Sequence, residues 1–110
     1  EQYLIRAEAE CHENKITEAV TDINIIRSRA GIGLVGSSIN SDSCLHLIAE
    51  ERKRELFTEW GNRFFDLKRT GQIDAVSGAI KPTWKPTSAL YPIPETELIY
   101  NYQLKQNPGY

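Results

Sequence analysis

Glu55 and Glu59 are the two residues whose type and spacing could perform catalysis. Glycoside hydrolysis uses two carboxyl groups, one on either side of the bond that is cleaved. Positions i and i+4 of a helix place both side chains on one face. Arg52 and Arg63 flank them, however, and neighbouring cations keep carboxylates ionised, which makes them poor proton donors. The hypothesis of a hydrolase therefore rests on spacing alone.

The same two carboxylates also belong to a series of charged residues that recur at steps of three or four. Opposite charges at these steps lie beside each other on a helix and form ion pairs. We therefore expect a structural ladder of ion pairs that is at least partly buried, in preference to a catalytic pair. Its members are Arg52, Glu55, Glu59, Arg63, Asp66 and Arg69.

Trp84 is the candidate ligand contact, because it stands between Pro82 and Pro86. The C–H faces of sugar rings stack on flat aromatic surfaces, and the two prolines stiffen the segment that carries the ring. The alternative is that Trp84 pins its loop to the core, which is the commoner role of a single tryptophan in a long loop. The sequence leaves both interpretations open.

The two cysteines, Cys11 and Cys44, fall in separate predicted helices. Buried free thiols are the expected state, and a disulfide is the alternative. A zinc site that adds His12 and His46 is conceivable. Adjacent helix positions such as Cys11 and His12 point about 100° apart, however, so we expect no metal and no other cofactor.

Length and charge exclude several classes of protein. A chain of 110 residues forms one domain or part of one, and a net charge of −2 gives no reason to expect nucleic acid or an anionic membrane surface. No window approaches the length of about 18 to 20 apolar residues that a membrane span needs. The chain opens inside a predicted helix, so we expect missing upstream helices, apolar surface left on residues 2–14, and self-association of the isolated chain.

The first 30 residues predict a helical hairpin. The pattern gives one helix over residues 2–14, a turn at Asn14 and Lys15, and a second helix that Thr17 caps and Gly31 ends. Small residues on the facing sides let the two helices approach closely. The hairpin resembles a tetratricopeptide-type unit.

A kinked helix over residues 44–70 follows the glycine- and serine-rich segment 31–42. Ser41 or Asp42 is its expected cap, and Gly61 with Asn62 is expected to break it. Its predicted apolar seam contains Leu45, Ile48, Ala49, Arg52, Leu56, Trp60, Phe64 and Leu67.

Residues 71–110 read as a loop and C-terminal segment. Residues 71–90 lose helical periodicity and are expected to be irregular, and residues 90–94 are expected to be extended because residues before proline avoid the helical region. Pro94 can then open a helical turn, with Glu95 and Glu97 at its positive end. The whole pattern predicts an all-α fold with a short extended PIP stretch.

Three separated motifs now stand in order along the chain: RAEAE…EAVTDINIIRSRAG, then EERKRELFTEWGNRFFDLKRTG, then YPIPETEL…LKQNPGY. Together they resemble the C-terminal part of the SusD/RagB family. The residues that fall on the family pattern ER…EL..EG.R.FDL.R and on PIP..E are Glu51, Arg52, Glu55, Leu56, Glu59, Gly61, Arg63, Phe65, Asp66, Leu67, Arg69, Pro92, Ile93, Pro94 and Glu97.

The resemblance implies residues 1–110 as the C-terminal part of one SusD-like domain. It implies a non-catalytic protein that binds oligosaccharides or other nutrients and partners a SusC-like TonB-dependent transporter. It also implies a surface lipoprotein of the outer membrane, anchored by a lipidated cysteine that cannot be Cys11 or Cys44, because both lie inside helical patterns. The motifs are framework motifs, so no binding residue is carried over. A tetratricopeptide-like interaction scaffold is the alternative function.

Overall fold

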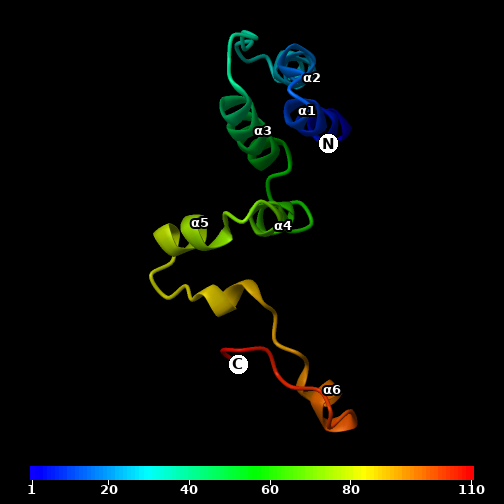
Figure 1. Cartoon of the computed structure of the whole chain (residues 1–110), viewed down its shortest axis with the longest axis vertical. Helices are drawn as coiled ribbons and strands as arrows, with labels where there is room; N and C mark the ends of the chain where they lie inside the picture. Colours follow the sequence, from blue (N-terminus) through cyan, green and yellow to red (C-terminus); the bar gives the residue numbers. More distant parts are fainter. The chain divides into compact units, whose positions relative to one another are not determined.

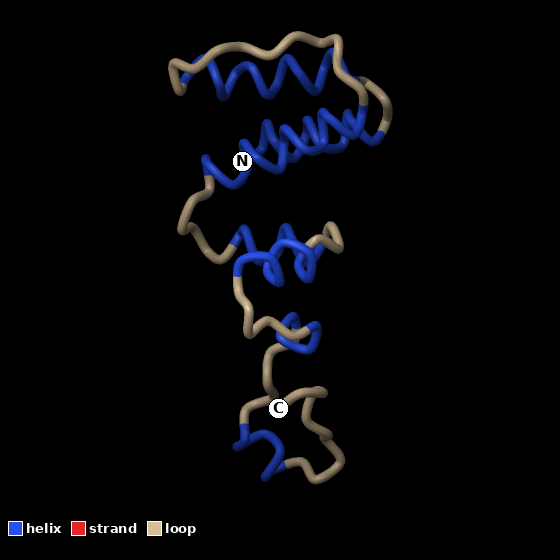
Figure 2. The backbone as a smooth tube through the Cα atoms, turned by 90° about the vertical axis from the view of Figure 1, so that its left-hand side faces the viewer, coloured by secondary structure: helices blue, strands red, loops and turns tan.

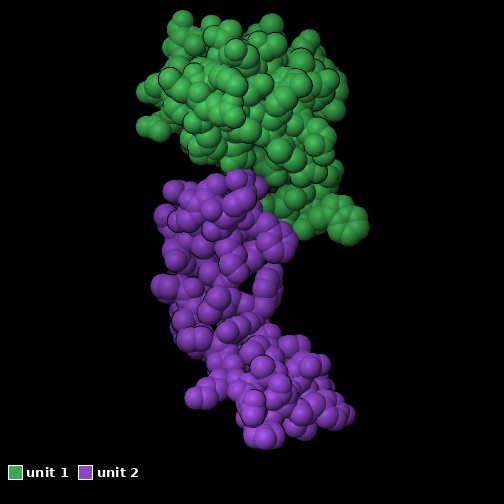
Figure 3. All heavy atoms as spheres, turned by 45° about the vertical axis from the view of Figure 1, so that its right-hand side comes forward, with its two compact units in different colours: residues 1–63 green, residues 64–110 purple.

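Helices and loops make up the structure, which is a computed structural model that describes all residues 1–110 and contains no strand (Figure 2). The expected all-α class is therefore confirmed. The chain divides into two compact units, residues 1–63 and residues 64–110, coloured separately in Figure 3. None of the helices is both long and apolar enough to span a bilayer.

The first unit contains three helices, α1 (Gln2–His12), α2 (Ile16–Arg29) and α3 (Ser41–Glu55), labelled in Figure 1. The predicted hairpin is α1 and α2, and α3 packs on both. The side chains at the centre are small or medium-sized, which lets the helix backbones approach closely. This core consists of Ala7, Cys11, Ala19, Ile23, Cys44 and Ile48.

Cys11 and Cys44 are joined in a disulfide, so the expectation of free thiols is wrong. The physical reason lies in the packing of α3 against α1, which places the two side chains opposite each other in the core. Their Cα atoms are 6.6 Å apart. Local sequence patterns could not predict this contact, because 33 positions separate the two residues.

The helix starts differ from the predicted caps by one or two residues. Lys15, and not Thr17, occupies the position before α2, because the chain turns sharply at Asn14, where φ is 61°. Asn40 caps α3 by accepting a hydrogen bond from the Ser43 amide at 2.8 Å. The hydroxyl of Ser41 is used elsewhere, since it donates to the carbonyl oxygen of Cys11 at 3.2 Å.

The long helix ends earlier than predicted. α3 stops at Glu55, and α4 (Asn62–Arg69) begins after a turn in which Thr58, Trp60 and Gly61 all have positive φ. Trp60 is 91% exposed and so is not part of a buried seam. Phenylalanine, threonine and tryptophan are weaker helix formers than the residues before them, and without buried packing they do not sustain the helix. The predicted break at Gly61 is present.

The second unit contains α5 (Ile73–Ile80), a short 3₁₀ helix η1 (Pro86–Ala89) and α6 (Glu95–Tyr100), besides most of α4 (Figure 1). The prediction of an irregular segment over residues 71–90 is wrong at α5. Ile73, Val76 and Ile80 recur at steps of three and four, and Asp74 lies in the first turn, where it favours the helix. Pro82 and Pro86, which follow α5 closely, made the short helical pattern of residues 73–80 difficult to recognise.

The PIP stretch is held by the end of the chain. Leu90 has extended backbone, and α6 begins directly after Pro94. The Gln106 side chain accepts from the Ile93 amide at 2.7 Å and donates to the Ile93 carbonyl at 2.9 Å. Tyr110 also donates its hydroxyl to the Leu90 carbonyl at 2.7 Å.

Candidate functional site

The charged residues of α3 form ion pairs with other parts of the first unit. The Glu51 carboxylate is buried and accepts a hydrogen bond from Arg27 on α2. Arg52 is also buried and lies 3.7 Å from the carboxylate of Glu1. Both residues have oppositely charged partners, as buried charges usually do.

The six residues of the expected ladder do not all lie in one environment. Asp66 and Arg69 form an ion pair at 3.1 Å within α4. Glu55 pairs with Arg29 on α2, which lies outside the ladder. Arg52 is buried, Arg63 is half-buried, and Glu59 is exposed in the turn that follows α3. α3 therefore forms ion pairs with α2, through Glu51 and Glu55, as well as pairs along its own helix.

The two candidate catalytic carboxylates lie in different elements. Glu55 is the last residue of α3, and Glu59 falls in the turn before α4. They are therefore not at i and i+4 of one helix, which was the premise of the hydrolase hypothesis. Glu55 is moreover engaged by the guanidinium of Arg29.

Trp84 lies against α5, half-buried. Its indole N–H donates to the Asp74 carboxylate at 2.8 Å. A Cβ atom placed on Gly78 would meet the Trp84 ring at 3.9 Å, so the ring passes close to the backbone of α5. These contacts support the interpretation of Trp84 as a loop anchor, while its exposed part is still available to a ligand.

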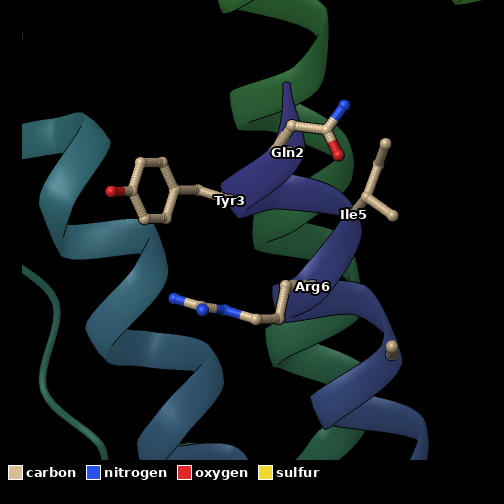
Figure 4. Close-up of a pocket in the computed structure, with 5 residues that line it drawn as sticks. Gln2, Tyr3, Ile5 and Arg6 are labelled. Carbon is tan, nitrogen blue, oxygen red and sulfur yellow. The ribbon is translucent and has the colours of Figure 1, made fainter.

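A shallow hollow of about 310 Å³ lies on the outer face of α1. Figure 4 shows Tyr3 and Arg6 extending to the same side of this helix, and Ile5 to the other. Arg6 donates to both carboxylate oxygens of Asp22 on α2, at 2.5 and 2.6 Å. These hydrogen bonds raise the pKa of Arg6 further, so it stays cationic. The residues that line the hollow are Gln2, Tyr3, Ile5, Arg6 and Ala9.

This hollow was missed by the sequence reasoning, which considered only the small, buried side of residues 2–14. The signal that could have found it is the pair Tyr3 and Arg6 at i and i+3, on the side away from Leu4 and Cys11. The guanidinium of Arg6 lies 5.6 Å from the centre of the Tyr3 ring. Because Arg6 is already committed to Asp22, this surface has no uncommitted charge with which to select a ligand.

The four residues that a zinc site would need, Cys11, His12, Cys44 and His46, do not form one. Cys11 and Cys44 form a disulfide with each other and so are not free thiolate ligands. No group of three or more histidine, cysteine and acidic residues has the arrangement of a metal site. His12 follows Cys11 at the exposed end of α1, and His46 is exposed on α3. Cys11 and His12 are adjacent on α1, where successive side chains point about 100° apart.

A model of the SusD family matches residues 1–88, four fifths of the chain. The chain therefore belongs to the SusD family, also called SusD/RagB, whose members are generally non-catalytic, nutrient-binding proteins of the outer-membrane surface. No curated protein and no solved structure matches it. The match contains the helical hairpin and the whole charged motif, and it ends before Pro92, so the PIP stretch is not part of it.

Proposed function

We propose that this protein binds an oligosaccharide or another nutrient at the outer-membrane surface of a bacterium and delivers it to a SusC-like TonB-dependent transporter, without cleaving it. The observation that carries the proposal is the family match over residues 1–88. We propose further that residues 1–110 are the C-terminal part of one SusD-like domain in a surface lipoprotein, since the first two motifs lie within the matched residues and the third follows them.

The geometry of the charged residues supports a framework role for this segment. Glu51 and Glu55 of α3 are engaged by arginines of α2, and Arg52 is buried. Such pairs fix how α3 lies on the hairpin, which gives a ligand-binding protein the rigid support that a binding surface needs. Trp84 is the proposed ligand contact within this chain, with loop anchoring as its alternative.

The helical hairpin carries the second candidate function, a tetratricopeptide-like scaffold that binds a peptide. Its α1 and α2 are antiparallel neighbours with small residues at their contact. This hypothesis uses residues 1–30 alone, whereas the family match uses most of the chain. The nutrient-binding proposal is therefore favoured.

The proposal is tested with the native lipoprotein that contains this chain. We expect calorimetry against a panel of oligosaccharides to detect saturable binding, and we expect the protein to copurify with its transporter from detergent-solubilised outer membranes. A reducing-sugar assay on the pure protein with the bound oligosaccharide checks for cleavage. We expect no release of reducing ends.

Three results would contradict the proposal in different ways. Release of reducing sugar by the pure protein would replace binding with hydrolysis. Peptide binding without oligosaccharide binding would favour the scaffold. Binding without a copurifying transporter would preserve capture of the nutrient but remove the proposed delivery step.

A further inference from the structure

The disulfide between Cys11 and Cys44 links α1 to α3 at the centre of the first unit. Cys11 is 1% exposed and Cys44 is 0% exposed. Their Cα atoms are 6.6 Å apart, within the range of about 4.4 to 6.8 Å that disulfides span. The bond closes a loop that contains all of α2 and the glycine-rich segment 31–40.

The core around this bond is small. Besides the two cysteines, its buried residues are Ala7, Ala19, Ile23 and Ile48, and the half-buried Ile16, Ile39, Leu45 and Leu47 pack against them. Domains of about 60 residues bury a modest share of their surface, and natural domains of this size often add a disulfide or a metal. In the first unit the disulfide adds a covalent constraint to the apolar core.

Polar contacts also hold α3 to the hairpin, besides the apolar contacts of Cys44 and Ile48. They include the Arg27–Glu51 pair and the hydrogen bond from Ser41 to the Cys11 carbonyl. In the unfolded chain none of these contacts restricts segment 31–40, whose glycines make it flexible. A covalent bond does restrict it, because it removes conformations from the unfolded state.

We propose that the Cys11–Cys44 disulfide is an oxidation-dependent lock, which gives the first unit its full stability only after the chain has left the cytoplasm. Two thiols lose two protons and two electrons and form one S–S bond. A second disulfide, that of a thiol–disulfide oxidoreductase or of oxidised glutathione, accepts them and becomes two thiols. In a reducing compartment both cysteines stay thiols. This inference rests on the outer-membrane location in the proposed function, which requires export.

Burial makes the lock persistent once it has formed. Attack on a disulfide requires that a thiolate or phosphine reach one of the sulfur atoms, and both sulfur atoms lie inside the core. Reduction must therefore wait for the first unit to open. The lock would stay closed on the cell surface as long as the unit is folded.

The test uses the native protein, purified without reductant. Peptide mapping by mass spectrometry should find the Cys11 and Cys44 peptides linked, and a thiol reagent in denaturant should find no free thiol. Reduction by TCEP should be at least about tenfold slower in buffer than in denaturant. After reduction in denaturant and refolding with TCEP, the melting temperature should be lower by at least about 10 °C.

The variants Cys11→Ala, Cys44→Ala and the double variant are the matched controls. If the bond is responsible, each single variant melts as low as the double variant, and TCEP changes none of the three. Two free thiols in the oxidised wild type, or an unchanged melting temperature after reduction, would overturn the proposal even if the variants fail to fold. Oligosaccharide binding is measured separately on oxidised protein, so a protein that binds nothing but carries the bond refutes only the proposed function.

Discussion

Arg27 of α2 donates a hydrogen bond to the carboxylate of Glu51 on α3, and both side chains are largely withdrawn from solvent, at 17% and 2% exposure. The two residues are 24 positions apart in sequence. Arg27 also donates to the Gly33 carbonyl at 2.6 Å, so one guanidinium ties together α2, α3 and the segment that connects them. Burial makes this pair expensive to break, because either partner alone would be an uncompensated charge.

Glu51→Ala should lower the free energy of unfolding by about 3 kcal/mol, because it leaves the half-buried guanidinium of Arg27 without its carboxylate partner. Chemical denaturation followed by helical circular dichroism measures this change. The matched control is Glu55→Ala, which removes a carboxylate of the same helix whose partner Arg29 is exposed. Its expected cost is less than about 1 kcal/mol. Equal costs for the two variants would contradict the importance of burial.

Glu59→Ala should be nearly neutral, with a change of less than about 0.5 kcal/mol, because Glu59 is exposed in the turn after α3. This outcome differs from what a buried ladder along one helix would give. Arg52→Ala serves as the comparison, since Arg52 is buried and should cost several times more. Thermal denaturation of both variants checks the order. A large loss in Glu59→Ala would show that the turn buries this carboxylate.

Trp84→Phe and Trp84→Ala distinguish a ligand platform from a loop anchor. The phenylalanine variant keeps a flat ring but loses the hydrogen bond to Asp74. If Trp84 is an anchor, both variants should lose stability, by about 1 kcal/mol for the hydrogen bond alone, and should keep their oligosaccharide affinity. If Trp84 is a platform, affinity should fall in Trp84→Ala and survive in Trp84→Phe. Calorimetry with the native protein and its melting temperature give the two readouts.

Gln106→Glu should loosen the PIP stretch selectively. The variant keeps an oxygen that can accept from the Ile93 amide but loses the N–H₂ group that donates to the Ile93 carbonyl. We expect the Ile93 amide to exchange its hydrogen several times faster, and amides of α1 to be unaffected. Hydrogen exchange followed by NMR measures both. Gln103→Glu is the control, because Gln103 is exposed. Unchanged exchange at Ile93 would contradict the role of Gln106.

Glu13 should titrate below its ordinary pKa of 4.5, because the ammonium of Lys15 donates a hydrogen bond to its carboxylate and lowers its pKa. The folded state therefore favours the ionised form. Its contribution to stability is present above pH 4.5 and is lost as the pH falls through the lowered pKa. An NMR titration of the Glu13 carboxyl carbon checks the direction. In Lys15→Met the pKa should return towards 4.5, and high salt should weaken the shift in the wild type.

The sequence by itself determined the features that depend on near neighbours along the chain. Apolar residues at steps of three and four predicted α1, α2, most of α3, and α4, and Gly61 predicted the break. The faces and ends of a helix depend on residues within one or two turns of each other, so they can be predicted from local sequence. The order of three motifs also indicated the family. The errors in this part are local: the missed α5, the caps at Lys15 and Asn40, and the early end of α3.

Only the tertiary structure decided which distant residues meet. The disulfide of Cys11 and Cys44, the pairing of Arg27 with Glu51, and the hold of Gln106 on Ile93 all join residues at least 13 positions apart. Periodicity says which side of a helix is apolar, but not which residue of another helix will lie against it. That depends on how the connecting loops close and on which pairs of small side chains let the helices approach. The burial of Glu51 and the disulfide between Cys11 and Cys44 could therefore not be predicted from the sequence, although most helical faces could.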